Sequence, residues 1–326
     1  MSFPADARHL SSREFFRSYV YWLAPALLAL VLALVYLNPF IGDWDGLDYT
    51  IFSLHGRPSS MALGRSAFTL FNFLLYQTAH AVFGLRPEQA YLLFKFVVVA
   101  TTPLAVTACW ILARDLSGSM RAATIAALLV ACSPILVIYG GQVMTDVPSV
   151  LFSATALAIH LRGLKQQRVW LILAGAAVLG IGVNLRETVG LYLPWLIVAP
   201  FVAGFGFNRR TIGILACSLA VFFVFAIGPF AVWFGAITEL SRRLVCLALL
   251  DATRSRATSD CLRQSATFPD LLFLASPLIL ISLPFALWKE WRARGFTLVF
   301  TAAVVGLFAT AMLFLNYSTT INWRYF

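Results

Sequence analysis

Two aspartates, Asp45 and Asp146, lie at the ends of apolar segments in a chain that otherwise keeps acidic residues out of such segments. A carboxylate can take a proton from an attacking hydroxyl group, and carboxylates can also bind a divalent cation. Each residue has a structural explanation as well. Asp45 belongs to a polar loop end, and Asp146 follows Thr145 at a typical helix start, where an acid complements the helix dipole. The two carboxylates can act together only if they lie at the same place. This depends on how the apolar segments cross the membrane.

The composition is typical of an integral membrane protein. Of the 326 residues, 60% are hydrophobic and 12% are charged, whereas soluble domains carry about 25% charged residues. The net charge of +10 comes from residues between the apolar segments, so we expect membrane lipids and no nucleic acid as partners. Cys109, Cys132 and Cys217 lie in apolar segments and are expected to be buried. Cys246 and Cys261 share one polar connection and can form a disulfide if it faces an oxidising compartment.

The apolar pattern predicts an all-α polytopic membrane protein, a single transmembrane domain over residues 1–326. Nine spans are expected, at residues 19–41, 90–112, 120–138, 146–161, 169–184, 188–206, 211–236, 269–288 and 296–315. Arg8, Arg13 and Arg17 precede the first span, and the short connections on the same side are basic, so the positive-inside rule places the N-terminus in the cytoplasm. Two long connections, 42–89 and 237–268, then lie outside, and both aspartates open toward that side.

The first outer loop, 42–89, contains a segment that resists this scheme. Residues 68–83 are apolar enough for a tenth span, but a tenth crossing would invert the rest of the chain and put basic connections outside. Asn72, Gln77 and His80 are spaced so that they can form a polar stripe on a helix. We therefore expect an amphipathic helix in the membrane interface, preceded by a shorter one over residues 49–54.

With this threading, acids and arginines gather at one membrane face. The set includes Asp45, Asp48, Arg65, Asp146, Arg186, Glu187 and Arg324. Because arginine binds phosphate through a planar pair of N–H donors, such a set suits a lipid-linked, phosphorylated substrate. Arg186 and Glu187 can equally mark the end of a span, and neighbours on a helix point about 100° apart, so they need not pair with each other. No P-loop, nucleophile elbow, zinc motif or dinucleotide fingerprint is present.

Several weak motifs follow one another in a fixed order. They are Asp45 four residues before Tyr49, then Gly56, Arg65 leading to Phe83-Gly84, Arg114-Asp-Leu-Ser-Gly118, Ser133-Pro134 and Tyr139 before Asp146, Arg186 leading to Leu193-Pro194, and Arg324-Tyr325. This order and topology resemble the GT-C superfamily of polyprenyl-phosphate-sugar glycosyltransferases, including the protein O-mannosyltransferases and the bacterial aminoarabinose and lipid A sugar transferases. The resemblance covers nearly the whole chain and implies a GT-C-like transmembrane helix bundle.

The chain departs from the family pattern in three ways. The Asp-Glu pair common in the family is Asp45-Gly46 here, and the usual lysine is arginine at positions 65 and 186. The chain also ends at Phe326, where relatives continue into further spans or a soluble domain. A truncated chain, a partial open reading frame and a short homologue are the alternatives for this end.

The resemblance implies transfer of a sugar from a polyprenyl-phosphate donor to an extracytoplasmic acceptor, a lipid, glycan or protein hydroxyl group, with inversion. It implies that Asp45 is the catalytic base or a carboxylate that orients the acceptor. It also implies that Asp146 positions the acceptor or a divalent metal cation, which the two carboxylates would bind together. Arg65, Arg186 and Arg324 would hold the donor phosphate. The implied location is the bacterial inner membrane, with a cytoplasmic N-terminus and a site that faces the periplasm or exterior.

Asp48 and Glu187 are further candidate site residues, and two other classes of function stay open. A transporter or lipid flippase would line a pathway with polar residues, but the predicted spans carry almost no charge at mid-depth, since Lys95 lies near an outer end. A non-catalytic subunit of a membrane assembly is the second alternative. Transfer of a radiolabelled sugar from a prenyl-phosphate donor would separate an enzyme from both.

Overall fold

The computed structural model describes residues 12–37, 44–59 and 65–234. Every regular element in these ranges is a helix. In chain order they are α1 (Ser12–Val35), α2 (Trp44–Leu54), α3 (Ser66–Phe83), α4 (Pro87–Ser117), α5 (Met120–Ala131), α6 (Pro134–Tyr139), α7 (Asp146–Gln166), α8 (Val169–Val183), the 3₁₀ helix η1 (Glu187–Tyr192), α9 (Leu193–Val202) and α10 (Arg209–Phe234). The last two predicted spans, the connection 237–268 with Cys246 and Cys261, and Arg324 lie outside the described residues.

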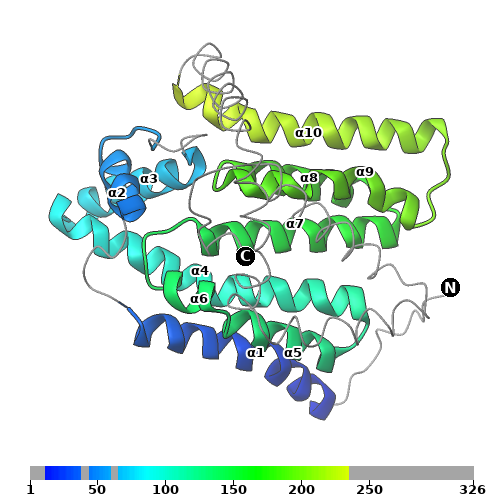
Figure 1. The fold of residues 1–326 in the computed structure, drawn as a ribbon, viewed down its shortest axis with the longest axis horizontal. Helices are drawn as coiled ribbons and strands as arrows, with labels where there is room; N and C mark the ends of the chain where they lie inside the picture. Colours follow the sequence, from blue (N-terminus) through cyan, green and yellow to red (C-terminus); the bar gives the residue numbers. More distant parts are fainter. Residues whose placement is uncertain (1–11, 38–43, 60–64, 235–326) are drawn as a thin grey trace, which may run out of the picture.

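The long helices stack side by side in layers (Figure 1). Helices α1 and α5 pack together and on α4, α4 packs on α7, α7 on α8, and α8 on α10. Helices α2 and α3 pack against each other at one end of the stack, to the left in Figure 1. Helices α2 and α3 therefore cover one end of the bundle, close to the start of α4.

Three described helices are long and apolar enough to cross a membrane: Pro87–Ser117, Asp146–Gln166 and Arg209–Pro229. Shorter apolar helices coincide with the other predicted spans in the described ranges. The helical class is therefore confirmed, and the number of nine spans stays a prediction. The predicted span 120–138 is two helices, α5 and α6. The break has a local cause, because Ser133 caps α6 through the Leu136 amide at 3.4 Å and Pro134 has no N–H to continue α5.

Close helix contacts are made at glycines. A Cβ added at Gly175 of α8 would lie 2.7 Å from the His160 Cβ of α7, and one at Gly180 would lie 2.5 Å from the Phe222 carbonyl oxygen of α10. Distances below about 3 Å are sterically excluded, so only glycine lets α8 approach both neighbours this closely. The C-terminal end of α8 is thereby fixed between α7 and α10.

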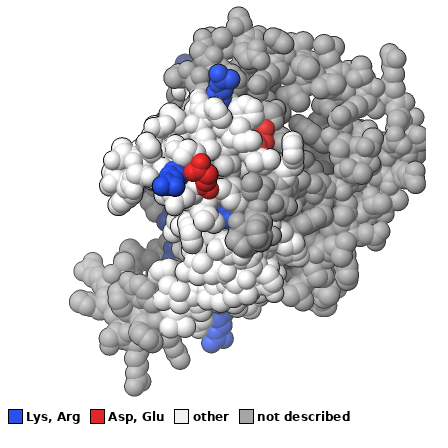
Figure 2. All heavy atoms as spheres, turned by 90° about the vertical axis from the view of Figure 1, so that its left-hand side faces the viewer, with Lys and Arg blue, Asp and Glu red and all other residues white. Residues whose placement is uncertain are grey.

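Much of the bundle surface is apolar. Leu27, Val31, Phe223 and Val224 are among the large hydrophobic side chains that are exposed. Seen from the end that carries α2 and α3, the described surface is mostly uncharged, with a few separate acidic and basic side chains (Figure 2). Lipid tails are as apolar as the side chains of a protein core, so such a surface can face lipid. The prediction that Cys132 and Cys217 are buried is wrong, because both side chains are exposed on the bundle. Apolar side chains can face lipid there instead of a protein core.

The predicted helices of the first outer loop are present as α2 and α3. The predicted polar stripe on α3 is wrong for Asn72. Asn72 is fully buried, while Gln77 and His80 are exposed. Asn72 shares a helix face with Phe68 and Tyr76, which is the face that α3 buries against the rest of the molecule.

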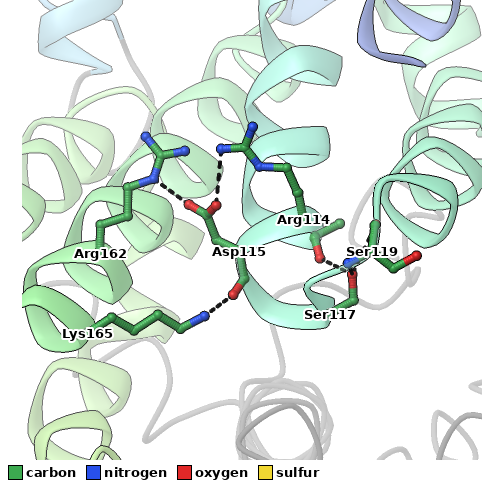
Figure 3. Close-up of polar contacts among 7 residues, drawn as sticks. Arg114, Asp115, Ser117, Ser119, Arg162 and Lys165 are labelled. Carbon is green, nitrogen blue, oxygen red and sulfur yellow. Dashed lines mark hydrogen bonds and ion pairs between the residues drawn. The ribbon is translucent and has the colours of Figure 1, made fainter. Parts of the chain in front are cut away.

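At the opposite end of the bundle, Asp115 joins α4 to α7 (Figure 3). The Arg162 and Lys165 side chains of α7 bind the carboxylate and the carbonyl oxygen of Asp115, and the Arg114 Nη2 lies 3.3 Å from Asp115 Oδ1. The basic connections that the threading assigns to one side of the membrane thus meet at one end of the structure.

Candidate active site

The first outer loop and the start of α7 meet at one end of the bundle. Asp45 lies in the first turn of α2, and Asp146 opens α7. The two segments touch at Gly46, where an added Cβ would be 3.2 Å from the Val143 carbonyl oxygen and 3.8 Å from the Tyr91 hydroxyl. Asp45 and Asp146 therefore lie at the same end of the structure. A side chain at position 46 would fit only if the Val143 carbonyl group moved by a few tenths of an ångström.

Tyr49 occupies the centre of this end. It follows Asp45 by one helical turn, so both residues are on one face of α2. The side chain is 1% exposed, and its ring packs edge-on against Phe68. The hydroxyl shares a hydrogen bond with the Thr145 side chain, beside Asp146.

The charges around Tyr49 come from three different segments of the chain. Burial raises the pKa of the Tyr49 phenol to about 12; the Arg65 guanidinium opposes this shift, and the carboxylates of Asp45 and Asp146 add to it. The phenol is thus a neutral hydrogen-bond donor at physiological pH, with one arginine and two carboxylates close enough to affect it.

Arg186 and Asp146 form a buried ion pair. Asp146 is 4% exposed and Arg186 is 7% exposed, and the Arg186 Nη1 binds the Asp146 Oδ1. Arg186 lies just after the end of α8 and caps η1 in an extended conformation. Because α8 is fixed between α7 and α10, this arginine is held next to the first turn of α7.

Arg65 and Glu187 form a second ion pair, with 2.8 Å between Nη1 and Oε2. Arg65 caps α3 with a φ of 44°, the left-handed region that few residues other than glycine adopt. The Phe68 and Thr69 amides both donate to the Arg65 carbonyl oxygen at 3.0 Å. The backbone at position 65 is therefore held in a conformation of higher energy, which is common at functional sites.

The neighbours Arg186 and Glu187 point to different partners and do not pair with each other. Arg186 binds α7, and Glu187 binds the residue that caps α3. Both arginines predicted to hold a phosphate thus lie at this end, each neutralised by a carboxylate. Asp45 and Asp48 are partly exposed on α2, and Arg324 lies outside the described residues.

The proposed shared metal site finds little support in the donor groups. Asp146 gives one carboxylate oxygen to Arg186, and no group of three His, Cys, Asp or Glu side chains lies together within the described ranges. Ca²⁺ takes six to eight oxygen ligands, most of them from protein, whereas Mg²⁺ is often held by one or two carboxylates together with waters and substrate phosphates. The described residues therefore do not form a cation site built from protein ligands alone.

Four residues near this site had no functional role predicted from the sequence: Tyr49, Thr145, Asn184 and Lys95. Tyr49 was detectable, because its i+4 spacing from Asp45 places both on one helix face. Lys95 is fully buried in α4, with its Nζ 4.5 Å from the centre of the Tyr91 ring. Tyr91 also lies beside Gly46 of α2, which only the fold reveals. Lys95 is therefore one helical turn along α4 from the residue that contacts α2.

Residues 69–233, just over half of the chain, match the dolichyl-phosphate-mannose-protein mannosyltransferase family. The chain belongs to this family. Membership makes it a glycosyltransferase of the GT-C type, and together with the apolar helices it confirms an integral membrane enzyme. The mannosyltransferase match includes Asp146, Arg186 and Glu187, whereas Asp45 and Arg65 precede it. No curated protein sequence gave a match.

Proposed function

We propose that this chain transfers a sugar from a polyprenyl-phosphate donor to a hydroxyl group of an extracytoplasmic acceptor, with inversion at the anomeric carbon. The observation that supports this most is the convergence of Asp45, Tyr49, Arg65, Asp146 and Arg186 at one end of an apolar bundle. The site lies where a prenyl tail can remain among lipid-facing helices while the phosphate and sugar meet polar groups. Family membership supplies the class of donor.

Asp45 is the better candidate for the base. It keeps part of its surface exposed, whereas Asp146 is buried and bound to Arg186. In a single displacement, Asp45 takes the proton of the acceptor hydroxyl group while that oxygen attacks the anomeric carbon. The bond between this carbon and the phosphate oxygen breaks, and the polyprenyl phosphate leaves with the electron pair. Asp146 then serves to orient Arg186 rather than to take the proton.

Arg65 and Arg186 are suited to the phosphate. They approach from α3 and from the end of α8, and each is shielded from water. Guanidinium groups in such surroundings stabilise the charge that grows on a leaving phosphate more than they would in water. The neutral Tyr49 hydroxyl is a further donor near both carboxylates and Arg65. Arg324 belongs to the same proposal on the family resemblance alone.

We place the site on the exterior face of a bacterial inner membrane. The support is the opposite end of the bundle, where Arg114, Arg162 and Lys165 surround the single carboxylate of Asp115 (Figure 3). Positive charge concentrates on the cytoplasmic side of membrane proteins. The end with Asp45 and Asp146 is then the extracytoplasmic one.

The test is transfer by the purified chain in lipid nanodiscs. The donor is radiolabelled mannosyl-phosphoryl polyprenol, and the acceptors are those of a cell-envelope extract. We expect Asp45→Asn to lower transfer by at least about 100-fold, the usual contribution of a general base, with an unchanged thermal unfolding curve. The matched control is Glu88→Gln, an exposed acid in the first turn of α4. Transfer by Asp45→Asn at the rate of the control would contradict the proposed role.

A further inference from the structure

Asn184, the residue that ends α8, uses every polar group of its side chain. The residue is 1% exposed. Its Oδ1 accepts a hydrogen bond from the Ser66 Oγ at 2.9 Å, and its Nδ2 donates to the Gly180 carbonyl oxygen at 3.2 Å and to the Phe225 carbonyl oxygen at 2.8 Å. One buried amide group thus joins the start of α3, the end of α8 and the backbone of α10.

The backbone of Asn184 adds a further bond to α3. Its carbonyl oxygen accepts from the Ala67 amide at 3.2 Å. The next residue contributes too, since the Leu185 carbonyl oxygen lies 3.5 Å from the Arg65 Nη1. The bonds at Ser66 and Ala67 fall directly after Arg65, the residue in the left-handed conformation. They hold the start of α3 against the end of α8 at the point where Arg65 projects.

Arg186 follows Asn184 by two residues, so the same contact determines where both arginines lie relative to each other. The arginines come from segments far apart in the sequence, and a phosphate group can be bound by both only if their spacing is correct. A displacement of about 1 Å is enough to lose much of the benefit of positioning. Asparagine suits this place because it offers a donor and an acceptor in one planar group.

We propose that Asn184 is a positioning residue that sets the spacing of Arg65 and Arg186 for one donor phosphate group. The inference rests on the proposed function, because it assumes that these arginines bind the phosphate. A structural role alone would predict a general loss of stability when the contact is broken. A positioning role predicts a loss that is specific for the phosphate part of a ligand.

Two substitutions weaken the contact in different ways. Ser66→Ala removes the bond to Oδ1 and leaves the bonds of Asn184 to α8 and α10, and Asn184→Leu removes all three side-chain bonds at similar size without adding a charge. Ser218→Ala is the control, because the buried Ser218 hydroxyl of α10 donates only to its own helix, at the Ile214 carbonyl oxygen.

The first measurement is binding of farnesyl phosphate and of farnesol to the full chain in nanodiscs. We expect wild type and Ser218→Ala to prefer farnesyl phosphate. Ser66→Ala should lose roughly fivefold to tenfold in affinity for farnesyl phosphate, the scale of one hydrogen bond, and Asn184→Leu at least as much. The affinity of both variants for farnesol should be unchanged. In the transfer assay, the two variants should raise the donor KM and leave the acceptor KM unchanged.

The outcomes separate this inference from the proposed function. If wild type does not prefer farnesyl phosphate to farnesol, the arginines do not form a phosphate site and the proposed function fails. If wild type shows the preference and Ser66→Ala retains it in full, the positioning role is wrong while the proposed function stands. Equal losses for both ligands would assign Asn184 to folding alone and would also overturn the inference. Ser66→Ala keeps the test decisive if Asn184→Leu does not fold.

Discussion

Glu187 is expected to restrain the donor site, so that its neutralisation strengthens donor binding. The carboxylate lies 2.8 Å from the Arg65 Nη1, with 19% of the Glu187 side chain and 11% of the Arg65 side chain exposed. A donor phosphodiester that binds Arg65 must approach this carboxylate. Glu187→Gln keeps the size of the side chain and an oxygen that can accept from Arg65, but it removes the negative charge.

The size of the effect follows from the distances. Two anions that share one guanidinium lie about 5.5 Å apart, and their repulsion is about 3 kcal/mol at an effective dielectric constant of about 20. Partial exposure of the pair screens this value, and the weaker bond from glutamine holds Arg65 less firmly. We expect a net gain near 1 kcal/mol, or about fivefold tighter donor binding.

The assay is titration of the full chain in nanodiscs with farnesyl phosphate, at low and at high salt. Wild type, Glu187→Gln and Glu88→Gln are compared, the last as the exposed acid control. The gain in Glu187→Gln should shrink as salt rises, because an electrostatic effect is screened. Weaker binding by Glu187→Gln at all salt concentrations would refute the reasoning and show that the orientation of Arg65 by the ion pair outweighs the repulsion between the two anions.

Three further predictions concern the same cluster. Because burial raises the pKa of Tyr49 from 10.0 to about 12, the unfolded chain ionises first as the pH rises. Stability should fall between pH 10 and 12, and Tyr49→Phe should reduce that fall in thermal unfolding. Arg186→Met leaves Asp146 buried without its cation and should cost about 3–5 kcal/mol in denaturant unfolding. Adding Asp146→Leu should recover most of this stability but not sugar transfer. Finally, because Asp146 gives a carboxylate oxygen to Arg186, we expect transfer to continue in EDTA, and restoration of lost activity by Mg²⁺ or Mn²⁺ would contradict this.

The sequence was sufficient to predict the all-helical bundle and the meeting of Asp45 with the segment that begins at Asp146. Apolar length and basic connections carry that information, because each crossing reverses the side of the chain. The sequence could not show which arginine pairs with which acid. The partners Arg65 and Glu187 are separated by most of the described chain, and only the packing of α3 on the end of α8 brings them together.

Asn72 shows why amphipathic patterns mislead in a membrane bundle. A polar residue on an apolar helix is expected to face water or headgroups. In α3 the buried face also carries Ser66 and Thr69, so the polar residues of this helix point partly inward. The interior of the site end is polar while its outer surface is apolar, and hydropathy alone cannot tell these two faces apart.

The two arginines that replace the family's usual lysines fit the geometry of this site. Arg65 and Arg186 each bind a carboxylate within the protein, and each is proposed to bind the donor phosphate as well. A guanidinium has five N–H donors in a rigid plane and can bind two anions along different edges. An ammonium group is a point charge on a flexible stem, and a single close carboxylate would neutralise and redirect it. The ion pairs with Asp146 and Glu187 therefore hold the guanidinium planes in fixed orientations without removing their capacity for phosphate, which a lysine at either position would not provide.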